Sequence, residues 1–289
     1  MKKILITGAN GLIGNELIEK LSKDNELYAI SRKKIQNKEN VEYIQMDLSS
    51  GLDENKLPKE IDVIYHLAQS ENFRKFPEKA QDVFRVNTLS TLNLLDYASR
   101  ASCEQFIYAS SGGVYGNSED GFKEDELLVS KENLGFYLGT KFCSEILVEN
   151  YKSIFDVVIA RFFFVYGPRQ NKSMLIPRLI NNVQNNLPIT LFGKEGIVIN
   201  PIFVKDACDA LISVQGTNGI CKLNIGGNEQ LSLKSIVEII GKVVDVCPDF
   251  KYVDAESNNL IGNIDKLKEN YYSPEISFLE GIKKMVDEG

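Results

Sequence analysis

The sequence predicts an α/β protein built around a doubly wound parallel sheet. Three observations support this prediction. Short apolar runs end in glycine or polar residues, stretches with helical spacing lie between them, and a glycine-rich turn directly follows the first run. Continuous apolar runs of this length are typical of strands buried on both faces of a parallel sheet. Because such strands are joined by right-handed crossovers, helices are expected on both faces.

The first run, residues 2–7, has the pattern of a buried strand that ends at the glycines. A helix is expected over residues 12–22, where apolar side chains recur at helical spacing, namely Leu12, Ile13, Leu17, Ile18 and Leu21. Further strands are expected at residues 26–30, 41–46, 61–66, 105–110 and 157–164. The later helices of this part are a long one near residues 78–101 and another over residues 137–151.

The character of the chain changes after Tyr166-Gly167-Pro168. Helices near residues 173–186, 204–214, 232–246 and 278–287 then alternate with short strands. One of those strands, residues 220–225, could return to the main sheet. Since no repeat or flexible linker marks a break, we expect a first domain of residues 1–166 and a smaller α/β lobe of residues 167–289 packed on it.

Composition excludes several classes of function. The net charge is −7 over 289 residues, and the longest basic run is the short Arg32-Lys33-Lys34, so nucleic acid is not an expected partner. The five cysteines are odd in number and widely spaced, without a CxxC pair, which indicates reduced thiols in a cytosol. No apolar stretch could span a membrane and the chain opens on a strand, so we expect a cytoplasmic protein without membrane contact.

The chain has a single histidine, His66. It excludes multi-histidine metal sites, and no metal centre is predicted. A Ser-His-Asp hydrolase would depend on this one residue.

Gly8, Gly11 and Gly14 lie where the first strand turns into the first helix. Glycines at such a turn let the backbone approach a pyrophosphate and let the helix pack on the sheet, while the helix N-terminus attracts the phosphates. The spacing is GxxGxxG rather than the commoner GxGxxG. The strand before it and the helix after it predict a dinucleotide-binding Rossmann domain. The alternative is a glycine-rich turn without a ligand.

The end of the second strand bears on which dinucleotide binds. Asp or Glu usually stands there and binds the adenosine ribose hydroxyls, but this chain has Ser31 followed by Arg32. A hydroxyl and a guanidinium suit a 2′-phosphate, so NADP is favoured over NAD. The alternative is that these are solvated loop residues and NAD is used. Asp47, at the end of the third strand, could receive the adenine amino group or cap a loop.

Tyr137 and Lys141 are four residues apart, so they share a face of the predicted helix. A lysine ammonium beside a phenol lowers the phenol pKa and yields an acid or base that works near neutral pH. Ser111 ends a predicted parallel strand, at the edge where α/β sheets place ligands; its neighbour Ser110 is the alternative.

Segments spread along the chain resemble the NAD-dependent epimerase/dehydratase group of extended short-chain dehydrogenases/reductases, the branch that modifies sugar nucleotides. These segments are TGANGLIG, MDL at 46–48, HLAQS at 66–70, VNTLSTLNLLDYA at 86–98, ASSGGVYG at 109–116, YLGTK, RFFFVYGPRQ at 161–170 and the terminal NIDKLKENYYSPEISFLEGI. The resemblance implies a catalytic triad of Ser111, Tyr137 and Lys141. Tyr137 would exchange the hydroxyl proton, Lys141 would lower its pKa and hold the nicotinamide ribose, and Ser111 would orient the substrate oxygen.

The motifs above and the resemblance together give the expected binding residues, and the arginines among them are cations available to hold an anion. The cofactor would contact Gly8, Asn10, Gly11, Leu12, Ile13, Ser31, Arg32, Asp47, Leu48, Leu67, Ala68, Tyr137 and Lys141. The substrate would contact Ser70, Arg74, Gly112, Phe164, Arg169 and Arg178. His66 and Asn87 match family positions to which we assign structural roles, which removes the only base of the hydrolase alternative.

The chain departs from the family in places that bear on its reaction. Gly112 and Gly113 replace the Asp-Glu pair with which 4,6-dehydratases perform elimination, so dehydration is discounted. Phe164 replaces an asparagine near the sugar-nucleotide diphosphate. Val198 or Ile199 stands where an arginine is usual, and a second diphosphate arginine, expected before residues 263–265, is missing. Other cations must hold the anion, or the substrate is not an ordinary nucleoside-diphosphate sugar.

These residues predict an oxidoreductase that acts on a sugar carbinol or keto carbon, with reduction of a 4-keto nucleotide sugar as the main reading. A nucleotide-sugar 4-epimerase using NAD shares the same residues, and only Ser31-Arg32 favours the reductase. A non-catalytic dinucleotide-binding sensor or assembly protein is the alternative from another class. The apolar stripes of the helices at 78–101 and 137–151 resemble those of the family's dimeric bundle and predict a homodimer; packing within one chain is the alternative.

Overall fold

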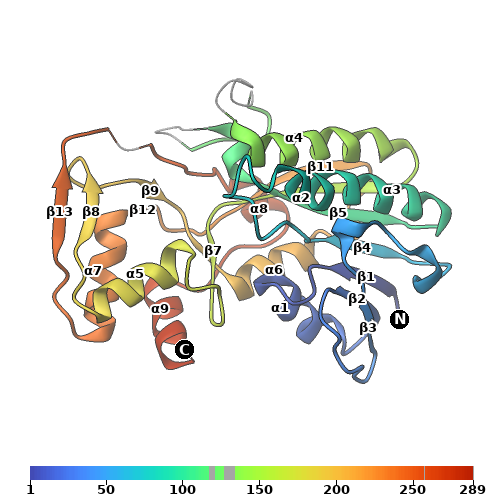
Figure 1. Cartoon of the computed structure of the whole chain (residues 1–289), viewed down its shortest axis with the longest axis horizontal. Coiled ribbons are helices and arrows are strands. Elements are labelled where there is room, and N and C mark those ends of the chain that lie inside the picture. The colour runs from blue at the N-terminus through green and yellow to red at the C-terminus, as the bar shows by residue number, and fades with distance from the viewer. Residues whose placement is uncertain (117–120, 127–133, 257, 289) are drawn as a thin grey trace. The chain divides into compact units, whose positions relative to one another are not determined.

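The computed structural model of the protein describes residues 1–116, 121–126, 134–256 and 258–288 (Figure 1). Its contacts divide the chain into two compact units that interleave along the sequence. The first unit comprises Met1–Val114, Leu128–Arg161 and Leu211–Leu223, and the second comprises Tyr115–Leu127, Phe162–Ala210 and Asn224–Gly289. The domain boundary expected after residue 166 stays a prediction.

A seven-stranded sheet is the centre of the first unit, with strand order β11-β6-β5-β4-β1-β2-β3. Its strands are β1 (Lys3–Thr7), β2 (Glu26–Ser31), β3 (Val41–Gln45), β4 (Val63–His66), β5 (Gln105–Ser111), β6 (Asp156–Phe162) and β11 (Ile220–Ile225). The pairs β1–β2, β2–β3, β1–β4 and β4–β5 are parallel. The doubly wound α/β prediction is confirmed. The strand order reverses between β1 and β4, and such switch points bind ligands at the carboxyl ends of the strands.

Burial of apolar side chains holds the sheet in its register. Ile4, Leu5 and Ile6 of β1 have no exposed surface, because the sheet is covered on both faces. Helices α3 (Ser90–Arg100) and α4 (Gly135–Asn150) lie on one side of the strands and α1 (Leu12–Leu21) lies on the other (Figure 1). Four short 3-10 turns lie among the described residues of this region. They are η1 (Leu48–Ser50) after β3, η2 (Glu54–Lys56) before β4, η4 (Gly112–Tyr115) after β5 and η6 (Tyr151–Ser153) before β6.

The long helix expected near residues 78–101 is interrupted. It consists of α2 (Ala80–Phe84), a π-helical turn η3 (Arg85–Leu89) and α3. Within the π turn, the carbonyl of Asn87 accepts hydrogen bonds from Thr91 Oγ1 (2.6 Å) and Ser144 Oγ (2.9 Å). Side-chain hydroxyls therefore take part in satisfying the backbone where the turn widens, and α3 is tied to α4.

The second unit is built from short strands and amphipathic helices. Its small sheets pair β10 (Ile202–Phe203) with β7 (Val165–Tyr166), β12 (Leu231–Ser232) with β9 (Val198–Ile199), and β13 (Phe250–Val253) with β8 (Ile189–Phe192). Its helices are α5 (Leu175–Gln184), most of α6 (Val204–Ser213), α7 (Leu233–Val244), α8 (Asp265–Asn270) and α9 (Phe278–Asp287). Ser232 caps α7 by accepting from Ser235 N, and α7 buries Ile236, Val237 and Ile240.

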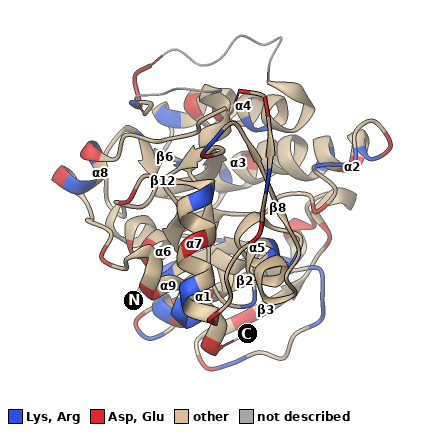
Figure 2. Ribbon diagram, turned by 90° about the vertical axis from the view of Figure 1, so that its left-hand side faces the viewer, with Lys and Arg blue, Asp and Glu red and all other residues tan. Residues whose placement is uncertain are grey.

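Charges of both signs occur on the same elements of the ribbon in Figure 2. On α8, for example, Asp265 and Glu269 accompany Lys266 and Lys268. Among the described residues, no helix has the length and apolar character needed to cross a membrane. Within the same residues, no cluster of three or more His, Cys, Asp or Glu side chains is placed to hold a metal ion.

Candidate functional site

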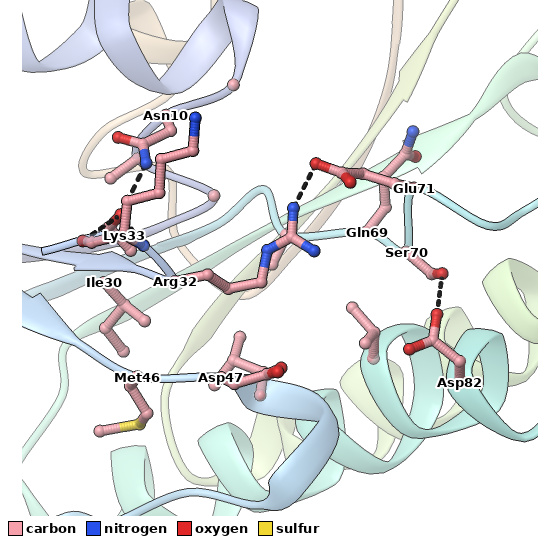
Figure 3. Close-up of a pocket in the computed structure, with 17 residues that line it drawn as sticks. Asn10, Ile30, Arg32, Lys33, Met46, Asp47, Gln69, Ser70, Glu71 and Asp82 are labelled. Atoms are coloured by element: carbon pink, nitrogen blue, oxygen red, sulfur yellow. Dashed lines mark hydrogen bonds and ion pairs between the residues drawn. The ribbon is translucent and has the colours of Figure 1, made fainter.

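A pocket opens in the first unit at the switch point of the sheet (Figure 3). The turn after β1, the ends of β2 and β3 and the loop after β4 line it. Its walls contain these residues that the sequence predicted: Gly8, Asn10, Gly11, Ser31, Arg32, Asp47, Leu48, Ala68 and Ser70. Leu12 and Ile13 begin α1 just beyond this turn, and Leu67 precedes Ala68 in the loop after β4.

The glycines form a turn that has no space for side chains. Gly8 has φ +70°, and a Cβ there would lie 3.0 Å from the backbone N of Ala68. A Cβ on Gly14 would lie 2.3 Å from the carbonyl oxygen of Gly8, so only glycine lets α1 approach β1 this closely. Gly11, the N-cap of α1, has no side chain to fill the space at the helix N-terminus. These features fit the pyrophosphate of a dinucleotide.

Ser31 sits at the end of β2, but its hydroxyl is already occupied. Ser31 Oγ donates to the carbonyl of Lys33 (2.9 Å) and accepts from Lys33 N (3.0 Å) and from Asn10 Nδ2 (2.6 Å). The residue is buried. A hydroxyl has one proton and two lone pairs, so these three bonds use its whole capacity.

Charged side chains face each other across the pocket. Arg32, from the end of β2, forms an ion pair with Glu71 from the loop after β4 (Figure 3). Nearby, Ser70 Oγ donates to the carboxylate of Asp82, which also accepts from Asn72 Nδ2 (3.1 Å). Asp47 accepts from Ser49 N (2.9 Å) and so caps η1, while it also lines the pocket.

The Tyr137–Lys141 pair lies on α4, one turn apart. Tyr137 Oη donates to Gln69 Oε1 (3.0 Å), and the tyrosine ring packs against Phe73 with centroids 5.0 Å apart. Because Gln69 also lines the pocket at the switch point, the phenol lies at the edge of that pocket. Burial raises the pKa of Tyr137 to about 12, in the opposite direction to the lowering that was expected from Lys141.

Lys141 is held in the interior of the first unit. Its ammonium donates to the carbonyl of Ala109 in β5 (2.9 Å) and stands 5.2 Å from the centroid of the Tyr108 ring. Burial lowers the pKa of Lys141 to about 8, although the Glu145 carboxylate acts in the opposite direction. The chain therefore keeps an amine that can ionise near neutral pH one helical turn from Tyr137.

The hydrogen bonds of Ser110 and Ser111 show which of the two is the better candidate for the catalytic serine. Ser110 is buried and its hydroxyl donates to Glu145 Oε1, which also accepts from Arg161 Nε (3.0 Å). Arg161 Nη2 and Glu145 Oε2 complete a two-bond ion pair at 2.7 Å. Ser110 thus belongs to a buried structural network. Ser111, half-buried at the end of β5, accepts from Gly113 N (3.2 Å) and is the better candidate.

His66 and Asn87 connect elements of the sheet and helix layer. His66 is fully buried, with Nδ1 2.7 Å from Thr7 Oγ1 and Nε2 2.9 Å from Thr91 Oγ1. Asn87 accepts from Ser70 N (2.9 Å) through Oδ1 and donates from Nδ2 to Thr140 Oγ1 (3.0 Å). Both side chains are enclosed by partners, which fits structural roles.

The remaining predicted substrate residues are dispersed. Gly112 begins η4 in the first unit, and the Arg74 guanidinium lies 4.9 Å from the centroid of the Phe73 ring. Phe164 and Arg169 belong to the second unit, and both have positive φ, at 50° and 62°. Arg178 lies on α5 and lines a separate pocket within the second unit, together with Asn182, Thr190 and Phe192 among others.

The structure adds pocket residues that the sequence analysis did not single out for the site, above all Gln69, Glu71 and Asp82. The first two come from a polar run, Gln69-Ser70-Glu71-Asn72, that follows β4 directly. A polar run at the carboxyl edge of a parallel sheet is a signal that could have identified them. Asp82 lies on α2, and nothing in the sequence places it in the pocket.

A dinucleotide-type turn and a neighbouring Tyr–Lys pair on one helix define an enzyme of the short-chain dehydrogenase/reductase type. Within this class, the chain belongs to the NAD dependent epimerase/dehydratase family, whose model matches residues 4–226. The family prediction is confirmed.

Three relatives illustrate the range of this similarity. The chain is 30% identical to an uncharacterized UDP-glucose epimerase, YtcB, of Bacillus subtilis (strain 168), over 97% of this chain and 95% of the relative. It is 27% identical to human dTDP-D-glucose 4,6-dehydratase, over 99% of this chain and 89% of that protein. A crystal structure of UDP-glucuronic acid 4-epimerase from Bacillus cereus with UDP-glucuronic acid and NAD superposes with TM-score 0.87 at 27% identity, covering 99% and 98%.

These comparisons revise two expectations. Several of the similar proteins are named as nucleotide-sugar 4-epimerases, which supports the alternative function more than reduction of a 4-keto sugar. NAD is the dinucleotide named for several of the similar structures, and the preference for NADP finds no support in them.

Proposed function

We propose that this protein is a nucleotide-sugar 4-epimerase that uses NAD, with a UDP-linked hexose as substrate. The observation that carries the proposal is the Tyr137–Lys141 pair beside the dinucleotide pocket, with Tyr137 Oη hydrogen-bonded to the pocket residue Gln69. The proposal is supported by the names of relatives that act on UDP-sugars and by structures that contain NAD.

The residues present have complementary chemical roles in this proposal. NAD in the pocket would accept a hydride from C4 of the sugar and return it to the opposite face. Tyr137 Oη would take the proton of the C4 hydroxyl and later give it back. The Lys141 ammonium would stabilise the phenolate, and Ser111 Oγ would hydrogen-bond the C4 oxygen. The turn at Gly8–Gly11 would hold the pyrophosphate.

Dehydration is disfavoured by the residues after Ser111. Elimination of water needs an acid near the sugar, but the next two positions are Gly112 and Gly113. A Cβ on Gly113 would lie 2.9 Å from Leu138 Cδ2, so a side chain there would have to displace the neighbour of Tyr137.

The test is an epimerisation assay on UDP-glucose and UDP-glucuronic acid, read by separation of the C4 epimers. The expected result is interconversion without net change in reduced nicotinamide. Tyr137→Phe should lower turnover by at least about 100-fold, because only the proton-transferring hydroxyl is removed, while NAD binding persists. Tyr151→Phe, at the C-terminal end of the same helix, is the matched control and should keep full activity.

Two results would contradict the proposal. Stoichiometric oxidation of NADPH with a 4-keto sugar, and no interconversion of 4-hydroxy sugars, would establish the reductase instead. Undiminished turnover by Tyr137→Phe would refute the assigned chemistry for either reaction.

A further inference from the structure

We propose that Glu71 makes the dinucleotide pocket select NAD against NADP, by engaging Arg32 and by placing a negative charge where a 2′-phosphate would need a cation. The inference rests on the proposed dinucleotide site but not on the reaction at the sugar. It reverses the preference that Ser31 and Arg32 predicted from sequence alone.

The Ser31 hydroxyl has no unused hydrogen-bonding capacity for a phosphate. Its only proton goes to the carbonyl of Lys33, and its lone pairs receive the Lys33 amide and the Asn10 side chain. To donate to a 2′-phosphate, the buried Ser31 hydroxyl would have to give up its bond to the Lys33 carbonyl. A new bond to the phosphate would therefore be made at the expense of one that already holds the turn after β2.

Arg32 is already ion-paired with a residue on the opposite wall of the pocket. Its guanidinium meets the carboxylate of Glu71, which comes from the loop after β4 (Figure 3). The Arg32 backbone carbonyl accepts from Gln45 Nε2 (3.2 Å), which links the end of β2 to β3. A 2′-phosphate could use Arg32 only by competing with Glu71, and the displaced carboxylate would stay in the same pocket.

The side chains that line the pocket include more acids than cations. Arg32 and Lys33 are its cations, and Asp47, Glu71 and Asp82 are its acids. Burial acts to raise the pKa of Asp82, but hydrogen bonds from Ser70 and Asn72 outweigh it and the pKa is lowered, so this carboxylate is ionised at neutral pH. A phosphate monoester adds about 1.5 to 2 negative charges, so its entry into this pocket is opposed by repulsion that NAD does not meet.

Glu71 is the acid whose removal tests the proposal most cleanly. Asp47 caps η1 and Asp82 binds two side chains, so changing either would disturb the backbone. Glu71 is exposed, with 72% of its side chain accessible, and its recorded contact is with Arg32. Glu71→Gln keeps the size of the side chain and removes its charge.

The experiment measures dissociation constants of the full chain for NAD⁺ and NADP⁺ by calorimetry. The unmodified protein should bind NAD⁺ more tightly. Glu71→Gln should improve binding of NADP⁺ relative to NAD⁺ by about tenfold, because a freed guanidinium can make charged hydrogen bonds to the phosphate. Adding Arg32→Ala to Glu71→Gln should abolish this gain. Glu78→Gln, an exposed glutamate of the same β4–α2 connection that does not line the pocket, is the matched charge control and should change nothing.

The outcomes are distinguishable from those of the epimerase test. A ratio that Glu71→Gln changes by less than about twofold, or an unmodified protein that prefers NADP⁺ or binds neither dinucleotide, would overturn the inference. Selective NAD⁺ binding without epimerisation would leave the inference standing and refute the proposed function. Epimerisation by the unmodified protein, together with no effect of Glu71→Gln on the ratio of the two dissociation constants, would support the proposed function and refute the inference.

Discussion

Lys141 is the residue at which the requirements of folding and chemistry conflict. Its side chain is buried beneath β5 with one recorded hydrogen bond, to the Ala109 carbonyl, and its pKa falls from 10.5 to about 8. A group whose pKa is lowered in this way is costly to keep protonated in the folded state. The proposed reaction needs that proton, because an ammonium beside Tyr137 favours the phenolate. Lys141 therefore lowers the stability of the fold while it supplies the charge that the proposed reaction needs.

We predict that Lys141→Met stabilises the protein at about pH 7 by roughly 1–3 kcal/mol, as expected from a pKa shift of this size at 1.4 kcal/mol per unit. The sign follows from proton binding: between the folded pKa and the unfolded pKa, the unfolded chain holds more protons. The unmodified protein should therefore gain stability as pH rises from about 8 to about 10.5. Lys141→Met should lack this gain.

Urea denaturation of both proteins at several pH values measures the difference. Lys152→Met, which removes an exposed lysine after the same helix, serves as the control and should change the free energy of unfolding little. A Lys141→Met protein that is less stable than the unmodified chain at neutral pH would show that the ammonium is well solvated or paired in the folded state.

For single residues, the sequence predicted the residue types of the site but not their hydrogen-bond and ion-pair partners. The glycines, Ser111, Tyr137 and Lys141 stand at strand ends or share a helix face, and such positions follow from periodicity. Ser31 was predictable as a hydroxyl at the end of β2, but not as one saturated by Lys33 and Asn10. Glu71 meets Arg32 across a distance of many residues in the chain, which no local pattern records.

Among the elements, β1, β4 and α3 are joined through one imidazole. Thr91 Oγ1 donates to the Asn87 carbonyl, so it can only accept from His66 Nε2. Nδ1 then accepts from Thr7 Oγ1, which in turn accepts from Ala68 N (3.1 Å). The neutral ring is fully satisfied, whereas a second ring proton would find no acceptor without rearrangement. Burial, with a smaller effect of Lys141, lowers the pKa of His66 to about 3.

We predict that His66 stays neutral throughout the folded range and that this junction makes the protein acid-sensitive. The unfolded pKa is 6.5, so below it the unfolded chain binds the proton and the folded chain does not. Stability is then lost as pH falls from about 6.5 toward about 3, by at most about 5 kcal/mol. His66 is the only histidine, so its imidazole NMR signals are assigned without ambiguity. A titration midpoint near the unfolded value in the folded protein would contradict the prediction.

The strands of the main sheet and the helices beside them were largely predictable, with one informative exception. Apolar runs marked β1 to β6, and helical spacing marked α1, α3 and α4. The π turn at Arg85–Leu89 was missed because its cause is tertiary: the Asn87 carbonyl is taken by Thr91 and by Ser144 from a different helix. Helical periodicity shows that a helix exists but not that a partner has widened one of its turns.

For the whole molecule, the open question is how many chains assemble. Large apolar side chains are exposed on the helices of one side of the first unit: Phe84 (47%) on α2, Leu89 (40%) on the π turn, Leu92 (38%) on α3 and Ile146 (47%) on α4. Leu89 and Leu92 are three residues apart and share a face, and α3 packs on α4. Packing within one chain therefore leaves these side chains uncovered. This favours the predicted homodimer over the alternative, in which the apolar stripes pack only within one chain.

We predict that the protein is a homodimer at micromolar concentration and that Leu92→Glu combined with Ile146→Glu makes it monomeric. A stable interface buries about 1,200–2,000 Å² in total, and a charge placed in its apolar centre loses its hydration without gaining a partner. Ile154→Glu adds the same charge at a residue that is 57% exposed and lies beyond the end of α4, so it should leave the assembly unchanged. Light scattering gives the mass, and calorimetric NAD⁺ binding checks that the monomeric variant is folded. A monomer in the unmodified protein, or a dimer that survives both glutamates, would show that another surface or none holds the chains together.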